Sequence, residues 1–224
     1  MNVEIDLLQK LGNKEITKAQ LLQLAESDPS LLPKLLEGTS SSNATIRYGC
    51  GSVIVDLSEK HPDRLYAYME SFVALFDSKH RILTWNAMAA IANLTSVDVD
   101  CKFDAIFDKY YGFLGDEYMV TVANGVANSA KIASNKPYLA DRIASELLKV
   151  QHLKATPHLT EECKLVIAER AIKTFNTLIN YTQNKTALIA FAQKHKDSPR
   201  TSLKKEAQNF LKKWQLDDGG PEVI

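Results

Sequence analysis

The side chains that could supply covalent or metal chemistry are few and dispersed along the chain. Cys50, Cys101 and Cys163 form no C-x-x-C pair and no cluster with histidine. This spacing argues against a disulfide framework or a structural zinc site and favours buried free thiols. His152 and His158 lie six residues apart around a proline, so one helical face cannot present both to a metal ion.

The carboxylates do not form an acid/base pair either. Glu161 and Glu162 are adjacent, so their side chains diverge, and they suit the first turn of a helix. Asp98 and Asp100 lack the rest of a calcium loop. No phosphate-binding glycine loop, H-E-x-x-H or G-x-S-x-G motif occurs. We therefore expect no enzymatic activity, no cofactor and no metal.

Composition bounds the class of protein. The 224 residues are 45% hydrophobic and carry 27 basic and 27 acidic side chains, which is a globular balance without the net charge of a nucleic-acid polycation. The first 20 residues contain no apolar signal core, and no apolar run approaches the 18 residues of a membrane span. The expectation is a cytoplasmic protein that makes no membrane contact.

One apolar pattern recurs five times and must position everything else. Its offsets are 0, 4, 7, 8 and 11, which is one face of an α-helix, and successive copies start 37, 39, 45 and 36 residues apart. We call these segments the template helices. Small residues dominate their second position, which lets a neighbouring helix approach closely. The copies are Ile46, Cys50, Val53, Ile54, Leu57; Leu83, Ala87, Ala90, Ile91, Leu94; Val122, Val126, Ser129, Ala130, Ala133; Ile167, Ala171, Thr174, Phe175, Leu178; and Leu203, Ala207, Phe210, Leu211, Trp214.

A second set of amphipathic segments alternates with the template helices. These intervening helices are expected at 29–37, 62–77, 101–114, 137–150 and 185–196, three of them opened by a proline in the first turn. A further pair is expected at 3–11 and 17–26. The stretch 151–161 is expected to be the longest connection. No segment shows the period of two that a strand requires, so the chain is predicted to be all-α.

A helical hairpin of this length resembles a HEAT or armadillo-type repeat. The HEAT second helix commonly has the pattern V-R-x-x-A-x-x-x-L-x-x-L, and Ile46-Arg47 followed by Cys50, Ile54 and Leu57 resembles it. Later copies keep the apolar frame and lose the arginine. In such repeats the residue equivalent to Arg47 is more often an intramolecular hydrogen-bonding residue than a ligand contact.

The resemblance implies a right-handed α-α superhelix of about five to six HEAT-like hairpins, whose template helices line a concave groove. One hairpin cannot bury its apolar face alone, so the hairpins must stack. We expect a single domain over 1–216 and a flexible C-terminal tail over 217–224.

The groove implied by the resemblance gives candidate binding residues on the template helices. Most of them lie one residue after the position that Arg47 occupies in the first copy, and the others lie further along the same helices. The resulting hypothesis is a non-enzymatic scaffold or adaptor that binds a protein or peptide partner. The two aromatic candidates would be anchors, although the tryptophan is also suited to packing against the next hairpin. The two asparagines would hydrogen-bond to the backbone of a bound peptide, although they could equally be ordinary polar residues on the exposed face of a helix. The candidates are Tyr48, Trp85, Asn124, Asn128, Glu169 and Lys173.

An alternative hypothesis comes from the C-terminal region. Residues 185–213 contain eight basic and two acidic side chains, and such a segment suits either a solvated cap or a nucleic-acid surface. The alternative function is a nucleic-acid-binding or DNA-repair-like helical repeat protein. Against it stand the neutral net charge and the absence of tryptophans flanking Asp56 or Glu169.

Overall fold

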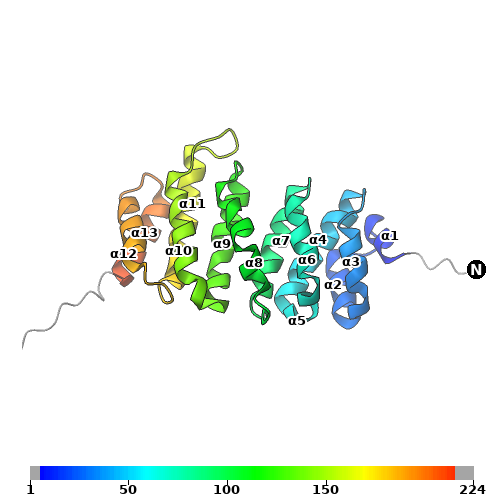
Figure 1. Ribbon diagram of the computed structural model, residues 1–224. Coiled ribbons are helices and arrows are strands. Elements are labelled where there is room, and N and C mark those ends of the chain that lie inside the picture. Colours follow the sequence, from blue (N-terminus) through cyan, green and yellow to red (C-terminus); the bar gives the residue numbers. More distant parts are fainter. Residues whose placement is uncertain (1–5, 215–224) are drawn as a thin grey trace, which may run out of the picture. The chain divides into compact units, whose positions relative to one another are not determined.

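The computed structural model describes residues 6–214, and the regular elements within this range are helices (Figure 1). An isolated bridge between Thr156 and Leu159 is the extended pairing found there, in the predicted long connection. The prediction of an all-α chain is confirmed. The predicted tail at 217–224 lies outside the described residues.

The chain forms two compact units, Met1–Ile106 and Phe107–Ile224, and each is described by itself. The first contains α1 (Leu7–Gly12), α2 (Lys18–Ser27), α3 (Leu32–Gly38), α4 (Ala44–Lys60), α5 (Pro62–Leu65), α6 (Met69–Ala74) and α7 (Arg81–Leu94). The boundary falls within α8 (Lys102–Gly112). The second continues with α9 (Met119–Asn135), α10 (Ala140–Leu148), α11 (Glu161–Leu178), α12 (Lys185–His195) and α13 (Thr201–Trp214).

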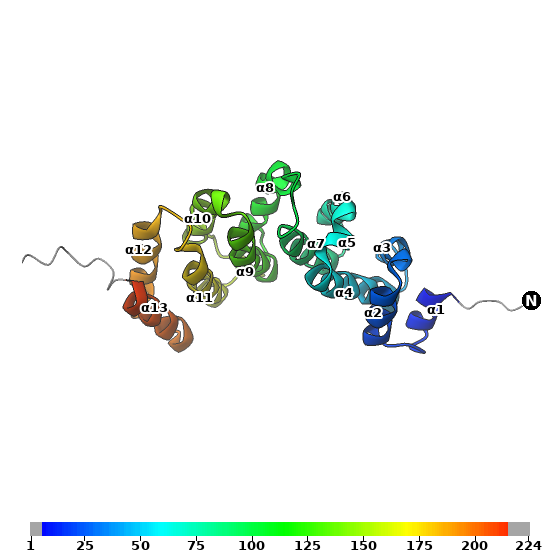
Figure 2. The ribbon, with the colours of Figure 1, turned by 90° about the horizontal axis from the view of Figure 1, so that it is seen from below.

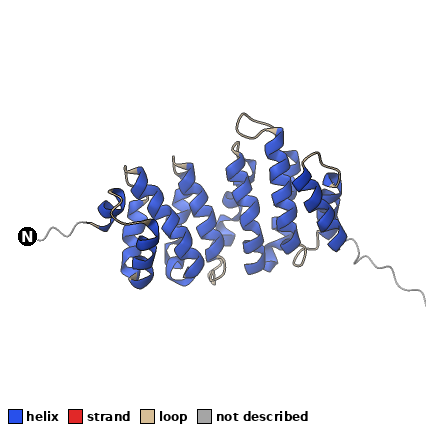
Figure 3. Cartoon of the chain, turned by 180° about the vertical axis from the view of Figure 1, so that it is seen from behind, coloured by secondary structure: helices blue, strands red, loops and turns tan. Residues whose placement is uncertain are grey.

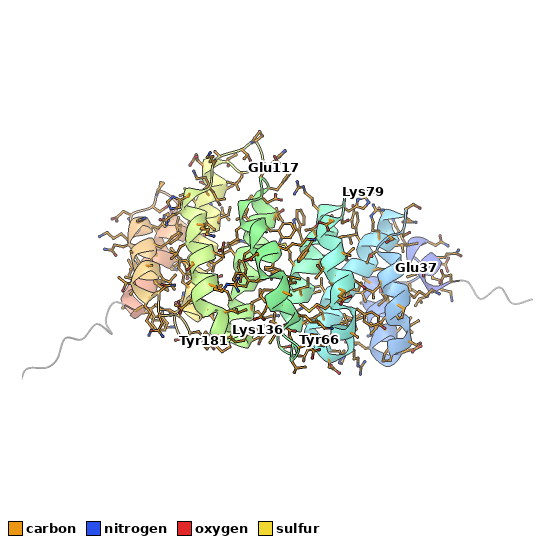
Figure 4. All side chains as sticks on the ribbon, in the orientation of Figure 1. Glu37, Tyr66, Lys79, Glu117, Lys136 and Tyr181 are labelled. Carbon is orange, nitrogen blue, oxygen red and sulfur yellow. The ribbon has the colours of Figure 1, made fainter. Side chains whose placement is uncertain are left out.

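Each unit has two layers of helices. In the first unit α2, α4 and α7 lie on one side and α3, α5 and α6 on the other; in the second, α9, α11 and α13 lie opposite α10 and α12 (Figure 2). Figure 3 shows the helices of both units joined by loops. Helices α4, α7, α9, α11 and α13 contain the template residues. Glu117 and Lys136 lie at opposite ends of α9 (Figure 4). The alternation predicted from the sequence therefore describes the layers inside each unit.

The template residues form the core. All of them are buried except Ile46, Ala130 and Trp214, which are partly exposed. Four of the template helices begin two or three residues before their first template residue, α11 begins six residues before Ile167, and each is long enough to carry the whole 0-to-11 stripe. The pattern thus identified both the helices and the face that each helix buries.

The intervening helices differ from the prediction in one respect. They are interrupted by short 3₁₀ turns, which open two of them at Pro29–Leu31 and Pro137–Leu139 and divide the expected helix at 62–77. The two opening turns begin at a proline, which disfavours α conformation in the residue before it. Short 3₁₀ turns of this kind are frequent at the ends of α-helices.

The expectation that all three cysteines are buried is wrong for two of them. Cys50 is buried on α4, and burial raises the pKa of its thiol to about 11. Cys101 is exposed in the turn before α8, with a left-handed backbone at φ 54°. Cys163 is partly exposed in the first turn of α11, where its N–H donates to the Thr160 hydroxyl. Helix starts expose these two side chains, which the apolar pattern does not cover.

Close helix contacts depend on small residues. A Cβ at Gly38 on α3 would lie 2.5 Å from Sγ of Cys50, and one at Gly51 on α4 would lie 2.9 Å from a methyl carbon of Leu83 on α7. Both distances are too short for a real Cβ contact, so glycine permits the approach of α4 to its neighbours on either side.

Buried hydrogen bonds join successive template helices. Within the first unit the Asn93 amide on α7 donates to the Ser58 hydroxyl on α4 at 2.8 Å. Within the second unit the Thr174 hydroxyl on α11 donates to the Val126 carbonyl on α9 at 2.9 Å. Each bond satisfies a polar group that stacking removes from water, so these polar residues are part of the helix interface.

Asp98 connects two hairpins of the first unit and caps the start of α8, which begins at Lys102. Its buried carboxylate accepts hydrogen bonds from the backbone N–H of Lys102 at 2.8 Å and of Phe103 at 3.0 Å, and from the Tyr66 hydroxyl at 2.6 Å. Burial and the hydrogen bond to Asp98 raise the pKa of Tyr66 to about 12. The left-handed Cys101 lies within the turn that this carboxylate closes.

We expect Gly38→Ala to destabilise the protein by about 1–3 kcal/mol, because the new methyl group overpacks the contact with Cys50. The matched control is Gly112→Ala, since a Cβ there meets nothing within 4 Å, and its effect should be neutral or slightly stabilising. Urea denaturation measures both. Equal effects of the two substitutions would contradict the close contact.

We expect Asp98→Ala to reduce the free energy of unfolding by about 2–3 kcal/mol, because two N–H groups and the Tyr66 hydroxyl lose their acceptor. Tyr66→Phe removes one of these bonds and should cost about 1 kcal/mol. Chemical denaturation compares the two variants. A smaller loss for Asp98→Ala than for Tyr66→Phe would show that the carboxylate does not cap α8.

Candidate binding surfaces on the template helices

The two aromatic candidates lie on the first unit. Tyr48 on α4 and Trp85 on α7 are both partly exposed. The Tyr48 hydroxyl lies 3.5 Å from Nδ1 of His80, and the two rings pack edge to face with centroids 6.0 Å apart. His80 belongs to the start of the next template helix, so Tyr48 is anchored across one hairpin step.

Arg47 is an intramolecular hydrogen-bonding residue, as expected. It is buried, and its Nη1 donates to the carbonyl oxygens of Ser41 at 2.7 Å and Ser42 at 3.2 Å. Its guanidinium carbon also lies 4.7 Å from the Tyr48 ring centroid. Arg47 therefore holds the loop before α4 and one face of Tyr48 in place.

The two asparagines lie on α9 and are partly exposed. The Asn124 amide donates to the Val120 carbonyl of its own helix at 2.8 Å. The amide nitrogen of Asn128 is buried, and its side chain faces the hydroxyl of Tyr110. The use of this pair to read a peptide backbone stays a prediction.

Glu169 and Lys173 form the centre of a charged network on α11. Glu169 accepts from Lys173 Nζ at 2.6 Å, from the Ser202 hydroxyl at 2.6 Å and from Arg200 Nε at 3.2 Å. Arg200 also pairs with Glu162, which lies about two helical turns before Glu169 on α11. The two predicted residues are thus in direct contact, and three partners join them.

These charges surround a pocket of about 510 Å³ in the second unit. Small and apolar side chains from α9 and α11 form one part of its wall, and charged side chains form the other. The lining residues are Ala127, Ala130, Val166, Glu169, Arg170, Lys173, Thr174 and Arg200.

The network holds Glu169 ionised. Burial alone would raise the pKa of this carboxyl, but hydrogen bonds from Lys173, Ser202 and Arg200 outweigh it and lower the pKa to about 2. Hydrogen bonds to the carboxylates of Glu162 and Glu169 raise the pKa of Arg200. Near neutral pH the pocket therefore contains fixed charges of both signs.

Sequence reasoning missed Arg170, Arg200 and Ser202. Arg200 stands three residues before Leu203, the first template residue of α13, and His80 stands three residues before Leu83 of α7. In both cases this residue contacts the side chain two residues after the first template residue of the preceding copy: Tyr48 for His80, and Glu169 for Arg200. The register of the repeat could have indicated the contact.

Residues 6–214 contain no group of three or more His, Cys, Asp or Glu side chains close enough together to hold a metal ion. No described helix combines the length and the apolar character that crossing a bilayer requires.

Comparison with known proteins identifies the fold. No family model matches the sequence, and no curated protein matches it. The structure is similar to the designed armadillo repeat protein YIII(Dq)4CqI, with a TM-score of 0.58 and 18% identity over 94% of this chain and 95% of that chain. It is also similar to an engineered protein from the Northeast Structural Genomics Consortium, with a TM-score of 0.50 and 17% identity over 96% and 93%.

At these identities the likeness shows the fold alone. It confirms the predicted class, an α-α solenoid of helical hairpins, and places the chain among α-helical repeat structures. The finer assignment to HEAT or armadillo repeats stays a prediction.

We expect the Glu169 network to be a source of acid-sensitive stability. The folded-state pKa lies below the ordinary 4.5, so its contribution is present above pH 4.5 and is lost as pH falls toward about 2. Glu169→Gln should cost about 1–3 kcal/mol at pH 7 and progressively less in acid. Urea denaturation between these pH values measures the difference. Glu161→Gln, at an exposed pair with Lys164, is the control and should cost less than about 1 kcal/mol. A Glu169→Gln effect that does not change with pH would contradict the network.

Proposed function

We propose that this chain is a non-enzymatic scaffold that binds a protein or peptide partner through the exposed faces of its template helices. The single observation that supports this most is the pocket between α9, α11 and the start of α13. It is open on the layer of template helices, and its walls combine apolar and charged side chains. Such a surface suits a side chain of a partner better than a reaction.

The charges favour an acidic group on that partner. Glu169 already forms ion pairs with Lys173 and Arg200, and Glu162 also pairs with Arg200. Arg170 lines the same pocket, is exposed, and has no ion-pair partner among the described residues. The carboxylate of an acidic side chain on the partner would pair with the guanidinium of Arg170, and the methylene groups of that side chain would cover Ala127 and Ala130.

The remaining candidates extend the proposal to other template helices. Tyr48 and Trp85 would be aromatic anchors on the first unit, with Tyr48 already oriented by Arg47 and His80. Asn124 and Asn128 would supply polar contacts from α9, beside the helix that carries Glu169 and Lys173.

Nucleic-acid binding through residues 185–213 is the alternative. One of its basic side chains, Arg200, is already paired within the protein, with Glu162 and Glu169. This engagement reduces the charge available to phosphates and favours the protein-binding proposal.

Selection of short random peptides against the immobilised full-length chain tests the proposal. We expect enrichment of peptides that carry an acidic residue beside small apolar residues. The double substitution Arg170→Glu and Lys173→Glu should weaken an enriched peptide at least about tenfold in fluorescence anisotropy, because it replaces attraction by repulsion. Lys212→Glu, an exposed change on α13 outside the pocket, is the matched control and should leave binding unchanged.

Three outcomes would contradict the proposal. One is the absence of any enriched peptide, and another is an enriched peptide that binds the double variant as well as the wild type. The third is retention on DNA at low salt with a steep salt dependence, which would support the alternative.

A further inference from the structure

A second pocket lies in the second unit, between the end of the intervening helix α10, the start of α11 and the end of α12. Its volume is about 310 Å³, at the lower end of the roughly 300–1,000 Å³ typical of small-molecule pockets. None of its lining residues belongs to the pocket assigned above to a partner protein.

The floor of this pocket is apolar. Val150 from the turn after α10, Leu165 and Ala168 from α11, and Phe191 from α12 supply it. Leu165 is partly exposed, and the other three are buried parts of the core. An apolar group that enters the pocket therefore meets a floor already fixed by core packing, which lowers the entropy cost of binding.

The rim carries a positive charge that no acidic side chain in the pocket wall neutralises. Lys194 Nζ donates to the Gln151 amide oxygen at 2.6 Å, and this partner is uncharged. Lys164, in contrast, pairs with Glu161 at 3.0 Å, so these two charges cancel. All four residues line the pocket, which leaves a net charge of one at the rim.

His195 links the rim to the floor. Its ring lies 5.0 Å from the Phe191 ring and is partly buried. Burial, with Lys194 beside it, lowers the pKa of His195, so the imidazole is neutral near pH 7 and offers one donor and one acceptor. It therefore adds a directional hydrogen-bonding group without adding charge.

The loop before α11, at the end of the unit where the pocket lies, is fixed by contacts with the start of α9. The Thr156 hydroxyl donates to the Glu117 carbonyl at 2.8 Å, and the His158 and Tyr118 rings stack with centroids 4.2 Å apart. Glu117 marks this end in Figure 4, opposite Lys136. The connection before α11 is thus tied to the start of α9, and α11 presents its first turns to the pocket from a supported position.

We propose that this pocket binds a small carboxylic acid with a compact apolar body. The carboxylate lies at Lys194, in exchange for or beside the Gln151 amide, and the apolar body covers Leu165 and Phe191. Three features together favour this class of ligand: the apolar floor, the single unneutralised cation and the neutral imidazole between them. A dianion would exceed the available charge, and an uncharged apolar molecule would leave Lys194 without an anionic partner.

Phenylbutyrate and its uncharged analogue phenylbutyramide are suitable probes. We expect phenylbutyrate to bind the full-length chain in isothermal titration calorimetry and to shift the ring signals of His195 in NMR spectra. The amide should bind at least about tenfold more weakly, because it loses the charge-assisted hydrogen bond to Lys194.

Two substitutions separate charge recognition from apolar contact. Lys194→Gln should weaken phenylbutyrate about tenfold and leave the amide unaffected, whereas Leu165→Asn should weaken both. Lys196→Gln is the matched control, because it removes an exposed lysine two residues along that does not line the pocket. It should change neither affinity. The wild-type helical spectrum of each variant establishes that it folds.

The proposal is overturned if no signal of His195 or Phe191 shifts at saturating phenylbutyrate. It is also overturned if acid and amide bind equally well, or if Lys196→Gln weakens binding as much as Lys194→Gln. None of these results affects peptide binding at Arg170 and Lys173, so failure here is distinguishable from failure of the proposed function.

Discussion

A template helix in this protein has two apolar flanks to cover, and a single neighbour covers only one of them. Helix α4 packs against α3 on one flank and α7 on another, and α11 does the same with α9 and α13. Helix α4 reaches both neighbours because glycine stands at a contact on either side, at Gly38 and Gly51. The fold therefore depends on close approach of helices both within a hairpin and between consecutive hairpins, and the binding features described above lie on helices that are packed in this way.

The helices were predictable because their burial is periodic. The stripe of the α11 copy, from Ile167 to Leu178, is buried throughout, and the sequence pattern carries that information directly. The 3₁₀ turn at Tyr66–Tyr68 was not predictable, because it depends on how an intervening helix bends over the core. The exposure of Cys101 follows from a left-handed turn residue that has no signature in apolar spacing.

The candidate surface was predictable only in part. Register placed Glu169 and Lys173 on one face of α11, where they form an ion pair. It did not reveal Arg200 directly, because that residue lies in the loop before α13, outside the apolar stripe, and its contact with Glu169 becomes predictable only by comparison with the equivalent contact of His80 with Tyr48. Phe191 lies in the helix predicted at 185–196 and is buried, and it forms a pocket wall because α12 ends beside the start of α11. Both pockets are lined by residues from several helices and loops, whereas the apolar period describes the buried face of one helix at a time.

The hydrogen bonds between template helices have a consequence for how the chain folds. Ser58 and Asn93 are 35 residues apart, and Val126 and Thr174 are 48 apart, so each bond closes a loop of one hairpin step. Short loop closures have a low entropy cost, and low contact order is associated with rapid folding. A hairpin emerging during synthesis therefore finds its docking partner already made, in the segment that left the ribosome just before it.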